Sequence, residues 1–226
     1  MSLDKIYAII PVSKFSDAKT RLSPFLSASE REELLKVMLE DVTKALKRLV
    51  DKTIIISKDP KVIEYAKKLK VETIIEKEEN NTLNKALTQA MEYCRGKTKK
   101  VLIIPSDIPL ISKTNIKLII KQAQKLDFLI MPSKGGGTNA IITKPLGIDM
   151  NFGECSFKKH IESAEEKGYS PLVHDSFYMA LDVNTTEDLG EILIHGKNTK
   201  TKEYLESLGI SVESIHGPER LKVTRK

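Results

Sequence analysis

The chain has 226 residues, of which 40% are hydrophobic and 30% charged, and 37 Lys and Arg residues outnumber 31 Asp and Glu residues to give a formal charge of +6. The composition excludes global disorder, and the length suits one large domain. No apolar run approaches the roughly 20 residues of a membrane helix, and no secretory signal pattern is present. We therefore expect a cytoplasmic protein that does not enter a membrane. The two cysteines are too few for a disulfide framework, and the positive charge suggests an anionic partner, which can be a nucleotide, a phosphorylated metabolite or a nucleic acid.

Strand and helix patterns alternate along the chain. Apolar and β-branched runs predict strands over Ile6–Val12, Thr53–Ser57, Val71–Ile75, Val101–Pro105, Phe128–Pro132, Ala140–Thr143 and Met179–Val183. Apolar residues at helical spacing predict helices over Ser29–Leu49, Pro60–Leu69, Leu83–Cys94, Lys113–Leu126, Phe157–Lys167, a segment capped by Thr185, and Lys202–Leu208. This alternation predicts an α/β fold with a mostly parallel sheet. We assign residues 1–196 to one domain, and residues 197–226 to a basic segment that is either part of it or a tail.

A basic loop follows the first predicted strand. Lys14, Lys19 and Arg21 lie within eight residues, next to the start of a helix, where they can hold phosphate oxygens. The other interpretation is a solvated basic loop. The chain has neither the G-x-x-x-x-G-K-[ST] pattern nor the G-x-G-x-x-G pattern, so it lacks a P-loop and a dinucleotide fingerprint.

Carboxylates follow two other predicted strands. Asp107 lies between Pro105 and Pro109, which stiffen the turn, and a carboxylate held there can bind a hard divalent cation. Asp182 and Asn184 alternate along an extended segment and can face the same side. If these segments lie together, a metal can sit between Asp107 and Asp182, with Asn184 as a neutral ligand. An Asx turn at Asp107 and a helix-entry turn at Asp182 are the alternatives.

Two further segments offer groups for an anion. Thr138 follows three glycines, and Ser156 begins a predicted helix, so their hydroxyls and nearby backbone amides can approach a phosphate. A hairpin turn is the alternative for the glycines. The four histidines show no metal-binding spacing, and most of them are interpreted as surface or packing residues. Cys155 has no partner at a recognisable spacing that would make it a nucleophile.

Five motifs stand in the same order as in a known family. PVSKFSDAKTRLSP, PSDIPL, GGTNA, FGECSF-x-x-H-x-x-x-A and LDVNTTEDL together resemble the 2-phospho-L-lactate guanylyltransferases, called CofC. The resemblance runs from Ile6 to about Leu189. It implies a three-layer, Rossmann-like nucleotidyltransferase fold of the glycosyltransferase-A type, a homodimer, and transfer of GMP from GTP to 2-phospho-L-lactate with magnesium. Phosphoenolpyruvate and 3-phosphoglycerate are alternative acceptors.

The resemblance also implies roles for individual residues. Lys14, Lys19 and Arg21 match the basic loop expected at the GTP phosphates, and Asp107 matches the metal-binding Asp. Asp182 matches the first Asp of a D-x-D pair whose second position is here Asn184. The remaining matches are Thr138, Gly153 and Ser156, expected at the acceptor phosphate, and Asn84, expected near guanine or ribose. Thr82 departs from the family's glycine in that last stretch.

Two rival interpretations fit less well. Molybdenum-cofactor and sugar-phosphate nucleotidyltransferases typically open with L-A-G-G, whereas this chain has PVSKF and no glycine before Gly96. A nucleic-acid-binding module calls for a basic face with stacking aromatics, but the chain has six Phe, six Tyr and no Trp. Half of the excess charge lies in residues 219–226, outside the matched region. We therefore expect GTP and a small phosphorylated hydroxy acid as partners, and no nucleic acid.

Overall fold

The computed structural model describes residues 5–17, 19–215 and 220–225. Its strands are β1 (Ile6–Pro11), β2 (Lys52–Ser57), β3 (Glu72–Ile75), β4 (Lys100–Ile103), β5 (Phe128–Pro132), β6 (Thr138–Thr143), β7 (Leu172–Val173), β8 (Ile210–Ser214) and β9 (Leu221–Arg225). Its α-helices are α1 (Ala28–Leu46), α2 (Pro60–Lys68), α3 (Leu83–Cys94), α4 (Lys113–Ala123), α5 (Ser156–Glu166), α6 (Phe177–Ala180), α7 (Thr186–His195) and α8 (Lys200–Ser207). Short 3₁₀ turns occupy Phe15–Asp17, Thr20–Leu22 and Lys134–Gly136.

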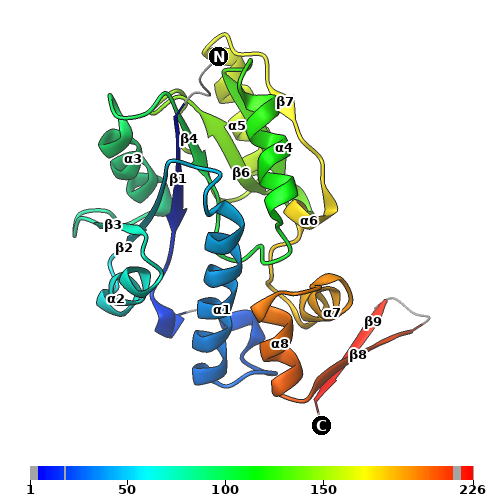
Figure 1. Ribbon diagram of the computed structural model, residues 1–226. Helices are drawn as coiled ribbons and strands as arrows, with labels where there is room; N and C mark the ends of the chain where they lie inside the picture. The colour runs from blue at the N-terminus through cyan, green and yellow to red at the C-terminus, as the bar shows by residue number, and fades with distance from the viewer. Residues whose placement is uncertain (1–4, 18, 216–219, 226) are drawn as a thin grey trace.

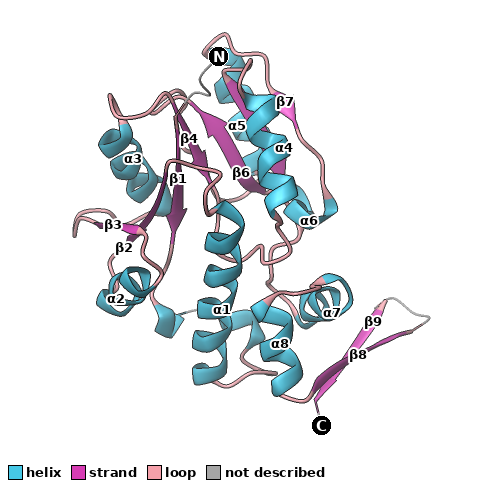
Figure 2. Ribbon diagram, in the orientation of Figure 1, coloured by secondary structure: helices cyan, strands magenta, loops and turns pink. Residues whose placement is uncertain are grey.

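The central sheet has seven strands in the order β3-β2-β1-β4-β6-β5-β7 (Figures 1 and 2). Strands β1, β2, β3 and β4 pair in parallel, as do β5 and β7, and only β6 is antiparallel to its neighbours. The predicted α/β fold with a mostly parallel sheet is therefore confirmed. Because β6 runs in the opposite direction, its first residue, Thr138, lies at the edge where β4 ends.

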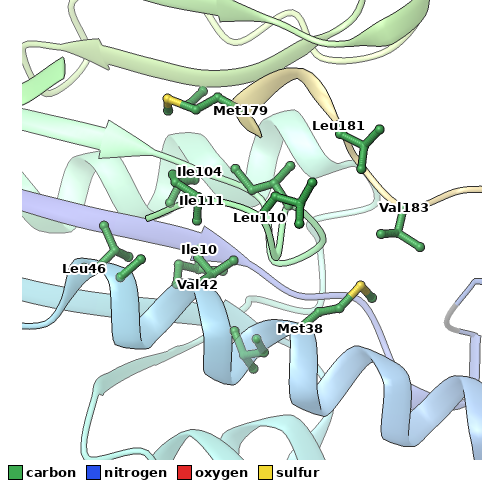
Figure 3. Packing of buried hydrophobic residues seen from close by; sticks show 14 of the residues in the cluster. Ile10, Met38, Val42, Leu46, Ile104, Leu110, Ile111, Met179, Leu181 and Val183 are labelled. Atoms are coloured by element: carbon green, nitrogen blue, oxygen red, sulfur yellow. The ribbon is translucent and has the colours of Figure 1, made fainter. Parts of the chain in front are cut away.

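Helices cover both faces of the sheet, which gives the three predicted layers. Along β1, Ile6, Ala8 and Ile10 belong to a core shared with α1, α2 and α4, whereas Tyr7 and Ile9 belong to a second core shared with α3 and α5. This alternation follows from the period of two along a strand, and burial on both faces explains why β1 is almost continuously apolar. Figure 3 shows part of the first core.

The longest helix begins at a capping box. The Ser27 hydroxyl accepts from the Glu30 backbone N–H, and the Glu30 carboxylate accepts from the Ser27 N–H at 2.8 Å. This pair satisfies two backbone donors that the helix itself cannot. Helix α1 ends at Leu46 instead of the predicted Leu49, because Lys47 already leaves the helical conformation with ψ of 124°.

The predicted strand over Met179–Val183 is wrong. Met179 lies in the short helix α6, and Leu181–Asn184 is irregular. Leu181 and Val183 are nevertheless buried, next to Leu110 and Met38 (Figure 3). The alternation of apolar residues over this segment thus reflects burial in the core and not pairing with another strand. The Val183 N–H donates to the Asp107 carbonyl at 2.9 Å, which joins this segment to the Asp107 loop.

The C-terminal segment contains the predicted helix and a hairpin that was not predicted. Helix α8 is attached to α1 through buried Asp41, whose carboxylate accepts from the backbone N–H groups of Lys200 and Thr201 and from the Thr201 hydroxyl. Strands β8 and β9 pair with each other and pack on α7 at Gly190, where a Cβ would meet side chains of the hairpin at 3.0–3.1 Å. The division of the chain at residue 196 stays a prediction.

Candidate active site

A pocket of about 700 Å³ opens at the carboxyl edge of the sheet. Its lining comes from the segments that follow β3, β2, β1 and β4, which are neighbours in that order. Ligands of open α/β sheets bind at this edge, because the loops after parallel strands converge there. The charged and amide side chains that line it include Lys14, Lys19, Arg21, Lys58, Glu76, Asn80, Asp107 and Asn184.

Lys19 joins two of the predicted site segments. Its ammonium donates to the Asp107 carboxylate at 2.5 Å and to the Asn184 side-chain oxygen at 3.4 Å. Its backbone is left-handed, with φ of 50°, at the N-cap of the second 3₁₀ turn. A lysine rarely adopts this conformation, and such strained residues cluster at functional sites. The backbone strain at Lys19 is therefore consistent with a functional position between the basic loop and the acidic cluster.

The basic loop is anchored behind Lys19. Phe15 is buried, its N–H donates to the Asp59 carboxylate at 2.9 Å, and its ring meets the edge of Tyr65 with 5.9 Å between centroids. Asp59 also caps α2 through the Lys61 N–H, so the loop after β1 is held by the helix after β2. Lys14 and Arg21, which flank the anchored part, are exposed and line the pocket.

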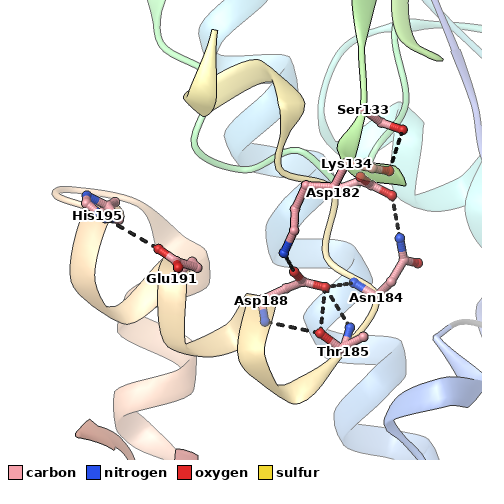
Figure 4. A network of polar contacts seen from close by, with 8 residues as sticks. All are labelled: Ser133, Lys134, Asp182, Asn184, Thr185, Asp188, Glu191 and His195. Atoms are coloured by element: carbon pink, nitrogen blue, oxygen red, sulfur yellow. Dashed lines mark hydrogen bonds and ion pairs between the residues drawn. The ribbon is translucent and has the colours of Figure 1, made fainter. Parts of the chain in front are cut away.

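Asp188 fixes the segment that carries the second carboxylate (Figure 4). One of its oxygens accepts from the backbone N–H groups of Asn184 and Thr185, and the other accepts from Lys134 at 2.9 Å. Burial alone would raise the pKa of Asp188, but these bonds, led by that of the Asn184 N–H, lower it. Asn184 in turn donates its side-chain amide to the Asp182 carboxylate.

The acidic cluster has the composition of a hard-cation site. Burial and then the nearby charge of Asp107 raise the pKa of Asp182, so the two carboxylates repel each other and a cation between them would relieve the repulsion. Asp107, Asp182 and Asn184 offer only oxygen ligands, which magnesium prefers. Among the described residues no group of three or more His, Cys, Asp or Glu could hold a metal, and the set proposed here includes the amide of Asn184. The residues fit magnesium, and its binding stays a prediction.

The predicted acceptor residues form a second group, in which Thr138 and Ser156 are buried and Gly153 is exposed. The Ser156 hydroxyl donates to the Thr138 hydroxyl oxygen at 3.2 Å, and the Ser156 N–H donates to the Gly153 carbonyl. Gly153 has φ of +130°, which a residue with a side chain rarely adopts. None of the three lines the pocket, but Thr138 begins β6 at the edge shared with the Asp107 loop.

Asn84 holds the backbone of Phe152 through both ends of its side-chain amide. Its amide nitrogen donates to the Phe152 carbonyl at 3.1 Å, and its amide oxygen accepts from the Phe152 N–H at 2.8 Å. Both ends of the amide thus hold the loop before Gly153, and Asn84 is not among the residues lining the pocket. Its contact with guanine or ribose stays a prediction, whereas the structure shows its contact with the Phe152 backbone.

Several residues of the site were not found from the sequence. Lys58 and Glu76 line the pocket, with 3.8 Å between the Lys58 Nζ and the Glu76 Oε1. Each follows a strand that was predicted, but a single charged residue after a strand is a weak sign of a site. His160 belongs to the FGECSF-x-x-H-x-x-x-A motif but was assigned no role, and its imidazole contacts the Thr138 hydroxyl. The signal for His160 was its position four residues after Ser156, on the same helix face.

The fold has counterparts among solved structures. A nucleotide-diphospho-sugar transferase candidate from Desulfovibrio desulfuricans covers 90% of this chain and 95% of its own, with a TM-score of 0.75 and 19% identity. A nucleotidyl transferase from Methanothermobacter gives a TM-score of 0.61 at 15% identity, over 90% and 99% of the two chains. The fold is therefore that of the nucleotidyltransferases, and none of the described helices is long and apolar enough to cross a membrane.

Sequence comparison is more specific. A family model described as "Guanylyl transferase CofC like" matches residues 6–226. The 2-phospho-L-lactate guanylyltransferase of Methanobrevibacter smithii is 63% identical over 223 residues, which is 99% of either chain. The chain belongs to the CofC-like guanylyl transferase family.

Proposed function

We propose that this protein transfers GMP from GTP to 2-phospho-L-lactate, forming lactyl-2-diphospho-5′-guanosine and pyrophosphate in the biosynthesis of a deazaflavin coenzyme. The observation that carries the proposal is the cluster of Lys19, Asp107 and Asn184 at one end of the pocket, in a chain of this family. It combines a cation for phosphate oxygens with acidic groups for a metal. A cytoplasmic homodimer is part of the same proposal.

GTP would lie along the carboxyl edge of the sheet. The triphosphate belongs at the end after β1 and β4, where Lys14, Lys19 and Arg21 supply positive charge. The base then extends toward β2 and β3, where Glu76 faces the pocket. Burial raises the pKa of Glu76, while Lys58 opposes that shift. The carboxylate is suited to accept the N1 and N2 hydrogens that guanine offers and adenine does not.

The reaction needs no nucleophilic side chain. An oxygen of the acceptor phosphate, already anionic, donates its electron pair to the α-phosphorus of GTP, and the bond from that phosphorus to the α–β bridging oxygen breaks. The bridging oxygen keeps the electron pair and leaves with pyrophosphate. The barrier comes mainly from repulsion and misalignment of two polyanions, so positioning and charge provide most of the catalysis. Lys14, Lys19 and Arg21 would stabilise the leaving pyrophosphate.

Asp107, Asp182 and Asn184 would hold magnesium, because they offer the oxygen ligands described above. When bound, the ion supplies charge neutralisation at the phosphates. Lys19 would share the Asp107 carboxylate with it, and Asp188 keeps the Asp182–Asn184 segment in place from behind. Thr138, Gly153 and Ser156 would bind the acceptor phosphate at the adjoining edge.

The test is pyrophosphate release from GTP and magnesium with 2-phospho-L-lactate, phosphoenolpyruvate or 3-phosphoglycerate, assayed side by side. We expect the fastest release with 2-phospho-L-lactate, and a faster rate with either of the others would reassign the acceptor. Release with none of them would refute the function. In a thermal-shift panel with magnesium, selective stabilisation by GTP supports the enzyme, whereas stabilisation by RNA or DNA alone supports a nucleic-acid-binding module instead.

A further inference from the structure

His160 is a buried imidazole in which both ring nitrogens have hydrogen-bond partners. It is 0% exposed on helix α5, where the Phe152 ring packs edge-on against it with 4.8 Å between centroids. Its Nε2 lies 3.0 Å from the Asn151 backbone nitrogen, and its Nδ1 lies 3.0 Å from the Thr138 hydroxyl oxygen. Neither bond involves a charged group.

These partners fix the position of the ring proton. The Asn151 N–H can only donate, so Nε2 must accept and carries no hydrogen. A neutral imidazole then carries its proton on Nδ1, which donates to the Thr138 oxygen. Burial lowers the pKa of His160 to about 4, against a smaller opposing effect of a backbone hydrogen bond with Ser156, so the ring is neutral at pH 7.

The Thr138 hydroxyl is thereby given a direction. Its oxygen accepts from His160 Nδ1–H and from the Ser156 hydroxyl, which leaves its own proton for a partner outside this trio. Thr138 is 8% exposed, compared with 2% for Ser156 and 0% for His160, so it is the least buried of the three.

We propose that His160 is a positioning residue, which holds the Thr138 oxygen as an acceptor so that the Thr138 hydroxyl proton points to the phosphate of the acceptor substrate. This inference rests on the proposed function and extends it to a residue behind the acceptor site. Asn84 supports the position of His160 indirectly, because it holds the backbone of Phe152, whose ring packs against His160.

Two substitutions of His160 separate its hydrogen bond with Asn151 from its hydrogen bond with Thr138. His160→Gln places an amide oxygen near the position of Nε2 and keeps the bond from Asn151, but loses the donor to Thr138. His160→Asn places an amide N–H near the position of Nδ1 and keeps that donor. We expect His160→Gln to raise the KM for 2-phospho-L-lactate about ten- to hundredfold, the range of one hydrogen bond to a charged group, with the KM for GTP unchanged. His160→Asn should stay within about threefold of wild type for both substrates.

Nitrogen-15 NMR of the histidine-labelled wild-type protein provides a readout that needs neither activity nor a variant. We expect an unprotonated Nε2 and a protonated Nδ1 for His160, and the reverse tautomer would overturn the inference. Equal KM changes in the two variants, or none in either, would overturn it too, provided that wild type turns over 2-phospho-L-lactate. If wild type turns over no phosphorylated acceptor, the proposed function fails along with the inference.

Discussion

Neutral burial of His160 makes the stability of the protein depend on pH in a defined window. Its pKa is about 4 in the fold, and its ordinary value is 6.5. Between these values the unfolded chain binds more protons than the folded one, so stability falls as the pH is lowered from 6.5 toward 4. At about 1.4 kcal/mol per pKa unit, the full difference is about 3 kcal/mol, of which about 2 kcal/mol is lost by pH 5.

The assay is urea unfolding at pH 7.5 and pH 5.0. His160→Gln cannot titrate, so its loss of unfolding free energy between these pH values should be smaller than that of wild type by about 2 kcal/mol. His174→Gln is the matched control, because it leaves His160 in place and removes an imidazole that is only half-buried. Burial also lowers the pKa of His174, so this variant should show a change in the same direction, and the account requires the change in His160→Gln to be the larger. If wild type and His160→Gln lose the same free energy, His160 is not a buried neutral imidazole and the tautomer assignment fails with it.

The other predictions concern catalysis and are read from steady-state kinetics. Asp107→Ala should lower kcat/KM by about 10²–10⁴-fold, or roughly 3–5 kcal/mol of transition-state stabilisation. The control is Asp127→Ala, which removes an exposed carboxylate just before β5 and should change kcat/KM little. Near-normal turnover of Asp107→Ala with magnesium present would refute the metal assignment. Thr138→Val should raise the KM for the acceptor more than that for GTP, and equal increases would mean that the acceptor site is misplaced. Glu76→Gln should weaken GTP binding by about tenfold and narrow its advantage over ATP, and an unchanged GTP-to-ATP ratio would place the base elsewhere.

The parts of the fold that could be predicted are those set by local patterns. Ile6–Val12 and Val101–Pro105 are apolar on both faces because their strands are central, and Ser27 and Thr185 cap α1 and α7 as their sequences suggest. The direction of β6 could not be predicted, because it depends on pairing with strands that are distant in the sequence, and this pairing gives no local sequence pattern. The Met179–Val183 segment misled for a related reason, since alternating burial looks the same with or without a strand partner.

The candidate site divides in the same way. The structure brings Lys19, Asp107, Asp182 and Asn184 together. Lys19 and Asp107 follow strands that were predicted, whereas Asp182 and Asn184 lie in or next to the segment that was wrongly predicted as a strand. The contact of Asn84 with Phe152 joins helix α3 to a loop 68 residues further along the chain, and no spacing rule encodes it. In the C-terminal hairpin, Arg225 pairs with Glu30 at 2.5 Å and lowers the pKa of Glu30 to about 2, and neither residue lines the pocket.

Phosphorus-31 NMR of the complete reaction tests the central claim most directly, because it observes the bond that forms. With GTP, magnesium and 2-phospho-L-lactate, we expect two mutually coupled resonances of a new diphosphate diester, appearing in step with an equal amount of pyrophosphate. Pyrophosphate without the diester would mean hydrolysis of GTP, and the absence of both would mean that this chain is not the proposed guanylyltransferase.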